Sequence, residues 1–291
     1  KLEDGFVILP PGLKRGSNRR LMGEDIKCGE TIISKGGSLR SQDVALIASI
    51  GQDTVTVYKP LRVAVFSSGD EVYDPNQQLP NGCIFDANRF AIIGLLSSLN
   101  CEVTDLGILP DKKDVIADSL VSVAPFHDMI VTSGGVSAGE EDHIKEAVEM
   151  NGSLNFWRFA IKPGRPVALG QLGHTAFVGL PGNPVAAMVT FMMIARPMIK
   201  RLSGERNFDV LPYKVESNFE YKKKLGRREW VRSKLSVDKK GNLILNKFKS
   251  GGSGILSSMV GSDGLVELDE RVEKVSEGDM LNFLPFSDLM Q

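Results

Sequence analysis

The middle of the chain alternates short apolar runs with helical patterns, and this alternation constrains the fold more than any other feature. LRVAVFSS, which begins at Leu61, is an unbroken apolar run, as expected of a strand buried on both faces. In the helical pattern that follows, Ile92, Leu96 and Leu99 share one stripe. Strands that alternate with helices at this spacing predict an α/β domain with a mostly parallel, doubly wound sheet over residues 61–203.

The regions on either side of residues 61–203 have different patterns. Residues 1–60 contain short β-like pieces and one helical pattern over 41–51, and DTVTVYK (53–59) alternates like a strand. Residues 204–291 consist of short alternating segments separated by Gly and Asp-Lys turns, which predict a small antiparallel β-barrel or sandwich. We therefore expect three regions, namely a β-rich N-terminal region, an α/β domain and a C-terminal β domain.

Composition and charge exclude several classes of partner. Of the 291 residues, 42% are hydrophobic and 24% are charged, as in an ordinary globular protein. A net charge of −1 gives no electrostatic case for a nucleic-acid partner, and no apolar run approaches the length of a membrane span. Cys28, Cys83 and Cys101 have no metal-binding spacing and fit a reducing compartment, so we expect a cytoplasmic protein.

Four unusual loops follow strands of the α/β region, where parallel sheets bind ligands. Taken singly, an acidic residue at such a loop is better explained by helix capping and the helix dipole. A glycine pair after a buried strand indicates a close approach of the backbone, either to a phosphate or to a neighbouring helix. The candidate residues in these loops are Glu71 in SSGDEV, Asp111 in GILPD, Gly134, Gly135, Ser137 and Asp142 in TSGGVSAGEED, and Pro181 and Pro184 in GLPGNP.

The acidic candidates become more informative when they are considered together. Glu71, Asp111 and Asp142 follow three different strands, so the fold brings them toward one edge of the sheet. Carboxylates that gather at one edge repel unless a cation lies between them, and Mg²⁺ is commonly held by one or two carboxylates together with substrate phosphates. The sequence therefore predicts a site for a nucleotide phosphate that binds with its metal ion.

Basic residues form a second group of candidates. Arg158 and Lys162 lie around a strand end in FWRFAIKPGRP, and Arg232 is expected to point inward because it alternates with Trp230. Ser253 lies in a Gly-rich turn that suits an oxyanion. For most basic residues of this region, a solvated face that protects an edge strand is the alternative explanation.

These motifs together resemble the molybdopterin molybdenumtransferases of the MoeA type, which include the E-domain of gephyrin. The resemblance implies a molybdopterin-binding (Mog-like) α/β domain, a C-terminal β-barrel and a partial N-terminal region. It also implies a homodimer whose active site lies between domains of both protomers. The matching stretches, in chain order, are RLMGEDI, SSGDEV, IFDANR, GILPD, TSGGVSAGEEDHIK, FWRFAIKPGRP, GLPGNPVAAMVTF and WVRS followed by GGSG.

The resemblance also implies an activity and the residues that carry it. Members of the family use Mg²⁺ to insert molybdenum from molybdate into adenylylated molybdopterin, and they release AMP. They are expected to contact the pathway adenylyltransferase and molybdoenzymes. By motif, the metal ligands are Asp25, Glu71, Asp111 and Asp142, the catalytic residues are Glu71, Asp111, Asp142 and Lys162, and the binding residues are Gly134, Gly135, Ser137, Arg158, Pro181, Pro184, Arg232 and Ser253.

Two departures from the family pattern limit this transfer of roles. Position 158 is Arg where relatives often have Lys, which keeps the charge but changes the donor geometry. The family's N-terminal lid, which precedes RLMGEDI, is absent from this sequence, and we expect a segment of the protein to be missing there. The alternative functions are a molybdopterin adenylyltransferase, which shares the α/β fold but lacks the C-terminal barrel, and a gephyrin-like scaffold.

Overall fold

The computed structural model describes residues 2–9, 11–135 and 143–291. The chain divides into two compact units, residues 1–56 and residues 57–291. The first unit contains a two-stranded antiparallel hairpin, β1 (Leu2–Glu3) with β2 (Phe6–Val7), and the helix α1 (Ser41–Ser49).

The helical pattern over residues 41–51 is confirmed by α1, and Gly51, with φ +80°, follows its C-cap Ile50 as expected of a C′ glycine. The predicted strand over residues 53–59 is wrong. Among the described residues no strand pairs with this segment, and Val55 and Val57 are 45% and 65% exposed. Alternation alone does not make a strand, because its backbone groups need a hydrogen-bonded neighbour.

The second unit contains a six-stranded sheet in the order β6-β3-β7-β11-β10-β8. The first four strands of this order are parallel, and β10 and β8 extend the sheet with antiparallel pairings. The strands are β3 (Arg62–Ser68), β6 (Glu102–Leu109), β7 (Met129–Ser133), β8 (Ser153–Arg158), β10 (Pro166–Leu172) and β11 (Thr175–Leu180).

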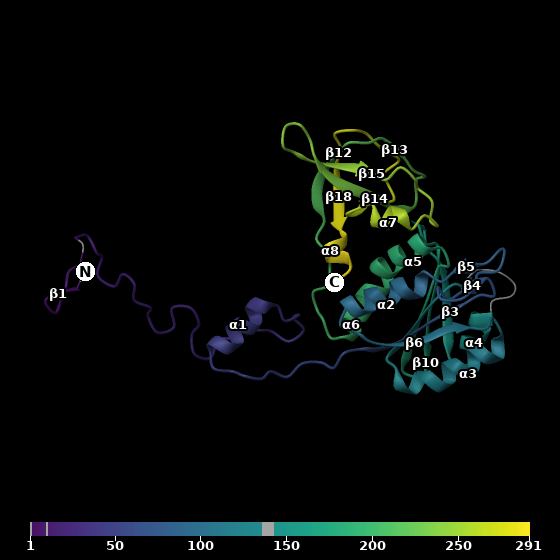
Figure 1. The fold of residues 1–291 in the computed structure, drawn as a ribbon, viewed down its shortest axis with the longest axis horizontal. Helices are drawn as coiled ribbons and strands as arrows, with labels where there is room; N and C mark the ends of the chain where they lie inside the picture. Colours follow the sequence, from purple (N-terminus) through teal and green to yellow (C-terminus); the bar gives the residue numbers. More distant parts are fainter. Residues whose placement is uncertain (1, 10, 136–142) are drawn as a thin grey trace. The chain divides into compact units, whose positions relative to one another are not determined.

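Helices cover both faces of this sheet, so the doubly wound α/β prediction is confirmed (Figure 1). One face carries α2 (Asn88–Ser98), α5 (Pro184–Thr190), the π-helical turn η2 (Phe191–Ala195) and α6 (Arg196–Leu202). The other face carries α3 (Lys113–Val123), the 3₁₀ turn η1 (Ala124–Phe126) and α4 (His143–Asn151). No helix in the described ranges is both long and apolar enough to cross a membrane.

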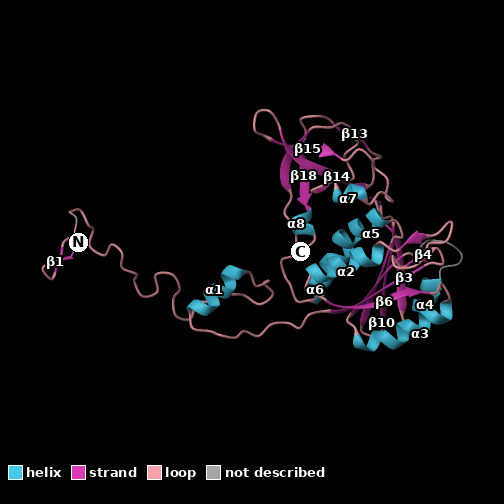
Figure 2. Cartoon of the chain, in the orientation of Figure 1, coloured by secondary structure: helices cyan, strands magenta, loops and turns pink. Residues whose placement is uncertain are grey.

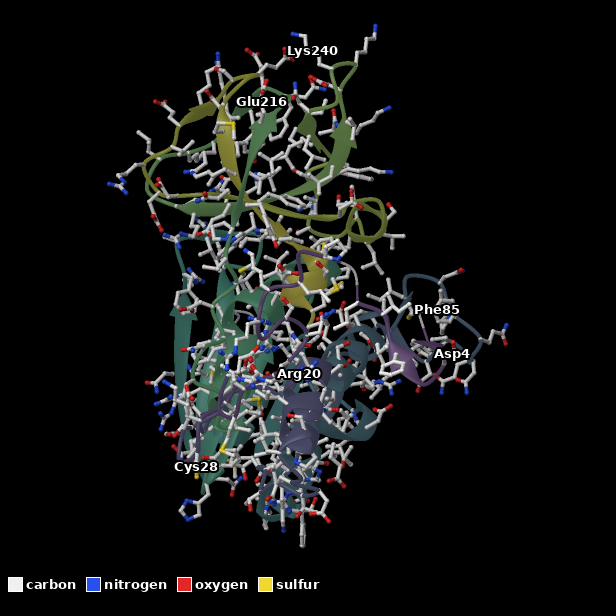
Figure 3. The ribbon with its side chains drawn as sticks, turned by 90° about the vertical axis from the view of Figure 1, so that its left-hand side faces the viewer. Asp4, Arg20, Cys28, Phe85, Glu216 and Lys240 are labelled. Carbon is white, nitrogen blue, oxygen red and sulfur yellow. The ribbon has the colours of Figure 1, made fainter. Side chains whose placement is uncertain are left out.

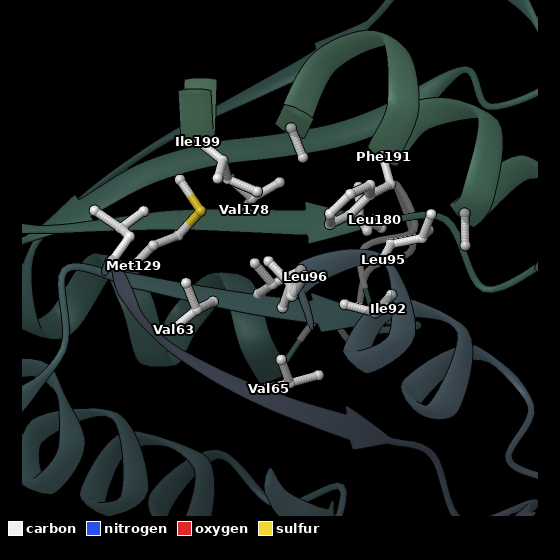
Figure 4. Packing of buried hydrophobic residues seen from close by; sticks show 14 residues of the cluster. Val63, Val65, Ile92, Leu95, Leu96, Met129, Val178, Leu180, Phe191 and Ile199 are labelled. Atoms are coloured by element: carbon white, nitrogen blue, oxygen red, sulfur yellow. The ribbon is translucent and has the colours of Figure 1, made fainter. Parts of the chain in front are cut away.

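The core on the two faces follows from alternation along the buried strands. On β3, Val63 and Val65 pack with Ile92 and Phe191 on the face of α2, as Figure 4 shows, while Phe66 packs on the face of α3 and α4. These side chains are fully buried, and each stabilises the fold by about 1.5–3 kcal/mol through removal from water.

The C-terminal part of the second unit is a closed five-stranded β-barrel, in the order β15-β12-β18-β16-β14 with β15 also paired to β14. Figure 2 draws its strands in magenta. The barrel interior is apolar, and exposed side chains such as those of Glu216 and Lys240 extend from its outside (Figure 3). The barrel strands are β12 (Tyr213–Ser217), β14 (Arg228–Val237), β15 (Leu243–Lys247), β16 (Gly264–Leu268) and β18 (Met280–Pro285).

Shorter elements complete the second unit. The pair β4 (Val72–Tyr73) and β5 (Ile84–Phe85) precedes α2, and β13 (Tyr221–Lys222) pairs with β17 (Lys274–Val275) beside the barrel. Two short helices, α7 (Ser257–Val260) and α8 (Phe286–Leu289), belong to the barrel region.

One strand joins the α/β sheet region to the barrel. After β8 leaves the α/β sheet, β9 (Ile161–Lys162) pairs in parallel with β14. Apolar packing supports this junction, since Val185 and Val189 of α5 share a buried cluster with Trp230 of β14. The KPG turn that follows β9 is therefore held between α5 and the barrel.

Gly164 in this turn has no room for a side chain. Its φ is +93°, and a Cβ atom would lie 2.1 Å from Oγ1 of Thr190 on α5. Gly173 has φ +59° but nothing within 4 Å of its Cβ position. The two glycines therefore share the left-handed backbone and differ in packing.

We expect Gly164→Ala to lower the free energy of unfolding by about 2–4 kcal/mol, since left-handed strain and overpacking add. Gly173→Ala, the matched control, carries the strain alone and is expected to cost about 1–2 kcal/mol. Urea denaturation of both variants measures the difference. Equal losses would show that contact with Thr190 does not constrain the turn.

Candidate functional site

The carboxyl ends of the parallel strands meet at one edge of the α/β sheet. The Ser68 hydroxyl, at the end of β3, donates a hydrogen bond to Oδ1 of Asp111 after β6 at 3.3 Å. A Cβ atom on Gly134, which follows β7, would lie 3.1 Å from the Ser68 carbonyl oxygen. Three of the candidate loops are thus in contact, as the strand-end rule for parallel sheets predicts.

The GLPGNP loop belongs to the same edge. The Gly134 N–H donates to the Leu180 carbonyl at 3.2 Å, and a Cβ atom on Gly182 would lie 3.6 Å from the Gly134 Cα. The Asn88 side chain, in the first turn of α2, donates to the Gly182 carbonyl at 2.7 Å. Pro181 and Pro184 flank this turn, and Pro184 is the first residue of α5, as predicted.

The glycine pair after β7 has a local explanation for one of its members. Gly135 has φ +62°, and a Cβ atom there would lie 2.4 Å from Cδ1 of Ile144 in α4. The left-handed backbone, together with contact with the neighbouring helix, therefore accounts for glycine at position 135 without a ligand. At Gly134, φ is +88° and the nearest atom is backbone, so a side chain would strain the meeting point of the loops.

The proposed metal ligands are placed unevenly by the structure. Asp111 is half-buried at the strand-end edge, whereas Glu71 is exposed and its carboxylate turns back toward Gly69. Asp142 and Ser137 lie outside the described residues, and Asp25 belongs to the first unit. Within the described ranges, no group of three or more His, Cys, Asp or Glu side chains suits a metal ion.

Other carboxylates near this edge are held by an arginine. Arg89 of α2 is 4% exposed and pairs with Asp86 at 3.0 Å, and it also bonds to Asp74 and Asp105. A buried guanidinium needs such partners, because an unpaired buried charge is costly. The network fixes the start of α2, and with it Asn88. Its carboxylates were not predicted as site residues, although IFDANR was among the motifs.

A small basic pocket lies in the barrel beside the β9–β14 junction. Its cavity volume is about 30 Å³, enough for about two waters. The charged and polar side chains of its lining come from β9, β13, β14, β15 and the turn after β15. They are Lys162, Tyr221, Glu229, Arg232, Lys247 and Ser250.

Arg232 is the most buried cation of this pocket, which confirms that it points inward. It is 5% exposed and donates to the Ser258 hydroxyl at 3.0 Å and to the carbonyls of Ser250 and Gly252 at 3.2 and 3.1 Å. Burial lowers the pKa of Arg232, and all three acceptors are neutral. Its positive charge is therefore solvated by dipoles and remains available to an anion.

Glu229 organises the other side of the pocket. This carboxylate is 1% exposed, accepts from the Tyr221 hydroxyl at 2.6 Å and from Nε of Arg227 at 2.7 Å, and lies 3.3 Å from the Lys162 ammonium. Lys162 also donates to the Tyr221 hydroxyl at 3.0 Å. Burial by itself raises the pKa of Glu229, but these hydrogen bonds and positive charges outweigh it and hold the pKa below its ordinary value.

The Gly-rich turn links the barrel to the strand-end edge. The Ser253 carbonyl accepts from the Val185 N–H, in the first turn of α5, at 3.0 Å. The structure thus brings Pro184 and Ser253 together, and it brings Lys162 and Arg232 into one pocket. Arg158, at the exposed end of β8, does not line that pocket, and neither does Ser253.

Sequence reasoning missed Tyr221, Glu229 and Lys247, which line the pocket with the predicted residues. One signal was available for Glu229, which precedes Trp230 in a strand with a buried pattern. The sequence contains no such signal for Tyr221 or Lys247, because Tyr221 lies in the short strand β13 and Lys247 is the last residue of β15.

Comparisons with known proteins cover both parts of the second unit. Residues 64–201 match the family described as "Probable molybdopterin binding domain", and residues 214–286 match "MoeA C-terminal region (domain IV)". The chain is 36% identical over 289 residues to the molybdopterin molybdenumtransferase of Haemophilus influenzae, covering 99% of this chain and 72% of that protein.

Two further relatives agree. The molybdenum cofactor synthesis protein cinnamon of Drosophila melanogaster is 33% identical over 78% of this chain and 38% of its own length. The crystal structure of the molybdopterin biosynthesis moeA protein of Pyrococcus horikoshii superimposes with a TM-score of 0.77 at 27% identity. That match covers 91% of this chain and 64% of the archaeal chain, so this chain spans about two thirds of the solved relative.

The lowered pKa of Glu229 predicts a pH-dependent contribution to stability. Its stabilising interactions are complete above the ordinary glutamate pKa of 4.5 and are lost as the pH falls through the lower pKa of the folded state. The excess unfolding free energy of the wild type over Glu229→Gln is therefore expected to shrink from pH 6 to pH 3. Urea titrations across this range measure it, and a pH-independent difference would contradict the assignment.

Proposed function

The chain belongs to the molybdopterin molybdenumtransferase family, and from that premise we propose that it inserts molybdenum from molybdate into adenylylated molybdopterin, with Mg²⁺, and releases AMP. Membership makes it a transferase of molybdenum cofactor biosynthesis. The observation that carries the finer proposal is the hydrogen bond from the Val185 N–H of α5, at the strand-end edge, to the Ser253 carbonyl in the Gly-rich turn. Ser250 and Gly251 of the same turn line the basic barrel pocket.

The barrel pocket is the proposed site of molybdate. This substrate is a tetrahedral oxyanion with two negative charges, and Arg232 and Lys162 supply buried and half-buried positive charge at the pocket wall. Charge-assisted hydrogen bonds from such groups are stronger than neutral ones. Ser253 and Arg158 do not line the pocket. By motif, they remain proposed ligands of the oxyanion or of a substrate phosphate.

The strand-end edge is the proposed site of the adenylate and its phosphates. The described donor set fits Mg²⁺ in the mode that uses one or two carboxylates together with phosphate oxygens and water. Asp111, oriented by the Ser68 hydroxyl, is the carboxylate best placed for it, with Glu71, Asp142 and Asp25 as further proposed ligands. When bound, the ion neutralises charge on the phosphates.

The chain's own residues divide the remaining work. Gly134, Gly135, Ser137, Pro181 and Pro184 are by motif the proposed binding residues for the substrate at the strand ends. The hydrogen bonds of Gly134 and Asn88 hold the Gly134 and GLPGNP loops together there. Hydrolysis of the phosphoanhydride takes up one water and breaks a P–O bond, and AMP leaves. Asp142 is the proposed base for that water. Lys162, at the pocket, offsets the negative charge that collects between the two substrates.

The cellular setting is part of the same proposal. Its elements are a homodimer whose second protomer completes the site, contacts with the pathway adenylyltransferase and with molybdoenzymes, and a cytoplasmic location. The free thiols of Cys28, Cys83 and Cys101 are consistent with a reducing compartment. The C-terminal barrel favours this enzyme over an adenylyltransferase, which would release pyrophosphate from ATP and molybdopterin.

We expect Asp111→Asn to reduce the rate of AMP release from adenylylated molybdopterin about 100-fold, a typical loss for one electrostatic catalytic group. Asp118→Asn, an exposed carboxylate on α3, is the matched control and should leave the rate unchanged. Chromatographic measurement of AMP at saturating molybdate tests both. Wild-type turnover in Asp111→Asn would remove this residue from the mechanism.

Removal of Mg²⁺ is expected to affect AMP release at the strand-end edge but not molybdate binding at the barrel pocket. With excess EDTA, AMP release should stop, because the phosphate charge is no longer neutralised. Molybdate binding at the barrel pocket, followed by calorimetry, should persist, since its ligands are cationic side chains. Full AMP release without divalent metal would contradict the Mg²⁺ proposal.

A further inference from the structure

The barrel pocket contains a positively charged side chain to which the proposed function assigns no role. Its lining contains three cations, Lys162, Arg232 and Lys247, and one carboxylate, Glu229. Family motifs assign roles to the first two cations and none to Lys247. Excess charge of one sign in a confined and partly buried space is costly unless a counter-ion binds there.

Glu229 does not balance this excess. Its carboxylate already accepts hydrogen bonds from Tyr221 and Arg227 and pairs with Lys162. Arg227 adds a further cation to the same carboxylate. Arg232 reaches only a hydroxyl and two carbonyl groups. Two cations of the pocket, Arg232 and Lys247, therefore lack an acidic partner among the described residues.

Lys247 is positioned for a ligand in the pocket. It is the last residue of β15, opposite Ser233 of β14, so its side chain lies on the face of the sheet that also carries Glu229. Its side chain is half-buried. The ammonium donates to the Phe248 carbonyl at 3.2 Å, a neutral acceptor that uses one of its three protons.

Tyr221 gathers two ammonium groups at the pocket. Lys162 Nζ lies 5.7 Å and Lys247 Nζ 5.9 Å from the centroid of its ring, both within the range of a cation–π contact. The ring attracts both cations, although they repel one another. An anion that contacts both ammonium groups would relieve that repulsion.

We propose that Lys247 is an oxyanion-binding residue of the barrel pocket, and that Lys162, Arg232 and Lys247 together hold one doubly charged tetrahedral oxyanion. This inference rests on the proposed function, because it takes molybdate as the oxyanion. Lys247 is a ligand that the family motifs do not contain. With it, three cations from β9, β14 and β15 select for an oxyanion with two negative charges.

Calorimetric titration of molybdate into the purified chain tests this proposal. Lys247→Gln should weaken molybdate binding about tenfold or more, as expected for loss of one hydrogen bond to a charged group. Lys247→Arg, which keeps the charge, should recover most of the affinity. Lys249→Gln is the matched control: it removes the same charge from an exposed position two residues away and should bind molybdate like the wild type.

Two further arms separate the possible failures. If Lys247→Gln binds molybdate normally while Lys162→Gln binds it weakly, the pocket is the oxyanion site but Lys247 takes no part, and the inference is wrong while the proposed function stands. If neither variant changes molybdate binding, or the wild type does not bind it, the pocket assignment falls with the inference. A parallel titration with inorganic phosphate identifies the ligand: a loss confined to phosphate would overturn the assignment to molybdate.

Discussion

The parallel pairing of β9 with β14 is the interaction on which the rest of the site depends. It brings Lys162, encoded in the α/β part of the chain, opposite Glu229 of the barrel. Because Glu229 is buried and its hydrogen-bond acceptors are occupied by Tyr221, Arg227 and Lys162, the position of the ammonium group is fixed from several directions. Without this pairing, the α/β part that contains Lys162 and the barrel that contains Arg232 would be held together mainly by apolar contacts.

Charge is distributed so that acidic and basic groups serve different ends of the site. Arg89 takes up Asp74, Asp86 and Asp105, so these carboxylates stabilise the start of α2 rather than add to the repulsion at the strand ends. Arg232, by contrast, is surrounded by neutral acceptors, which leaves its charge for a ligand. Helix α5, at the strand-end edge, contacts the Gly-rich turn after β15 through the hydrogen bond from the Val185 N–H to the Ser253 carbonyl. This bond joins two neutral groups, so it does not neutralise the acidic or the basic side chains.

Part of the candidate site was predictable because local pattern and topology rules are strong for this fold. The contact of Ser68 with Asp111 and of Gly134 with Leu180 follows from parallel strands that end at one edge. The inward direction of Arg232 follows from alternation with Trp230. The strand predicted over residues 53–59 failed because alternation describes a strand's faces but does not supply its hydrogen-bonding partner.

The sequence by itself determined the doubly wound α/β fold, the β character of the C-terminal region and the family to which the chain belongs, because periodicity and motif order are local properties. Only the tertiary structure decided that Gly135 packs against Ile144 of α4, and that Tyr221, Glu229 and Lys247 share a pocket with Lys162. These outcomes depend on pairings between residues distant in the chain, such as Lys162 with Glu229. Their physical basis is packing and charge balance between residues that are neighbours in space but far apart in the sequence, so no short stretch of the sequence contains both partners.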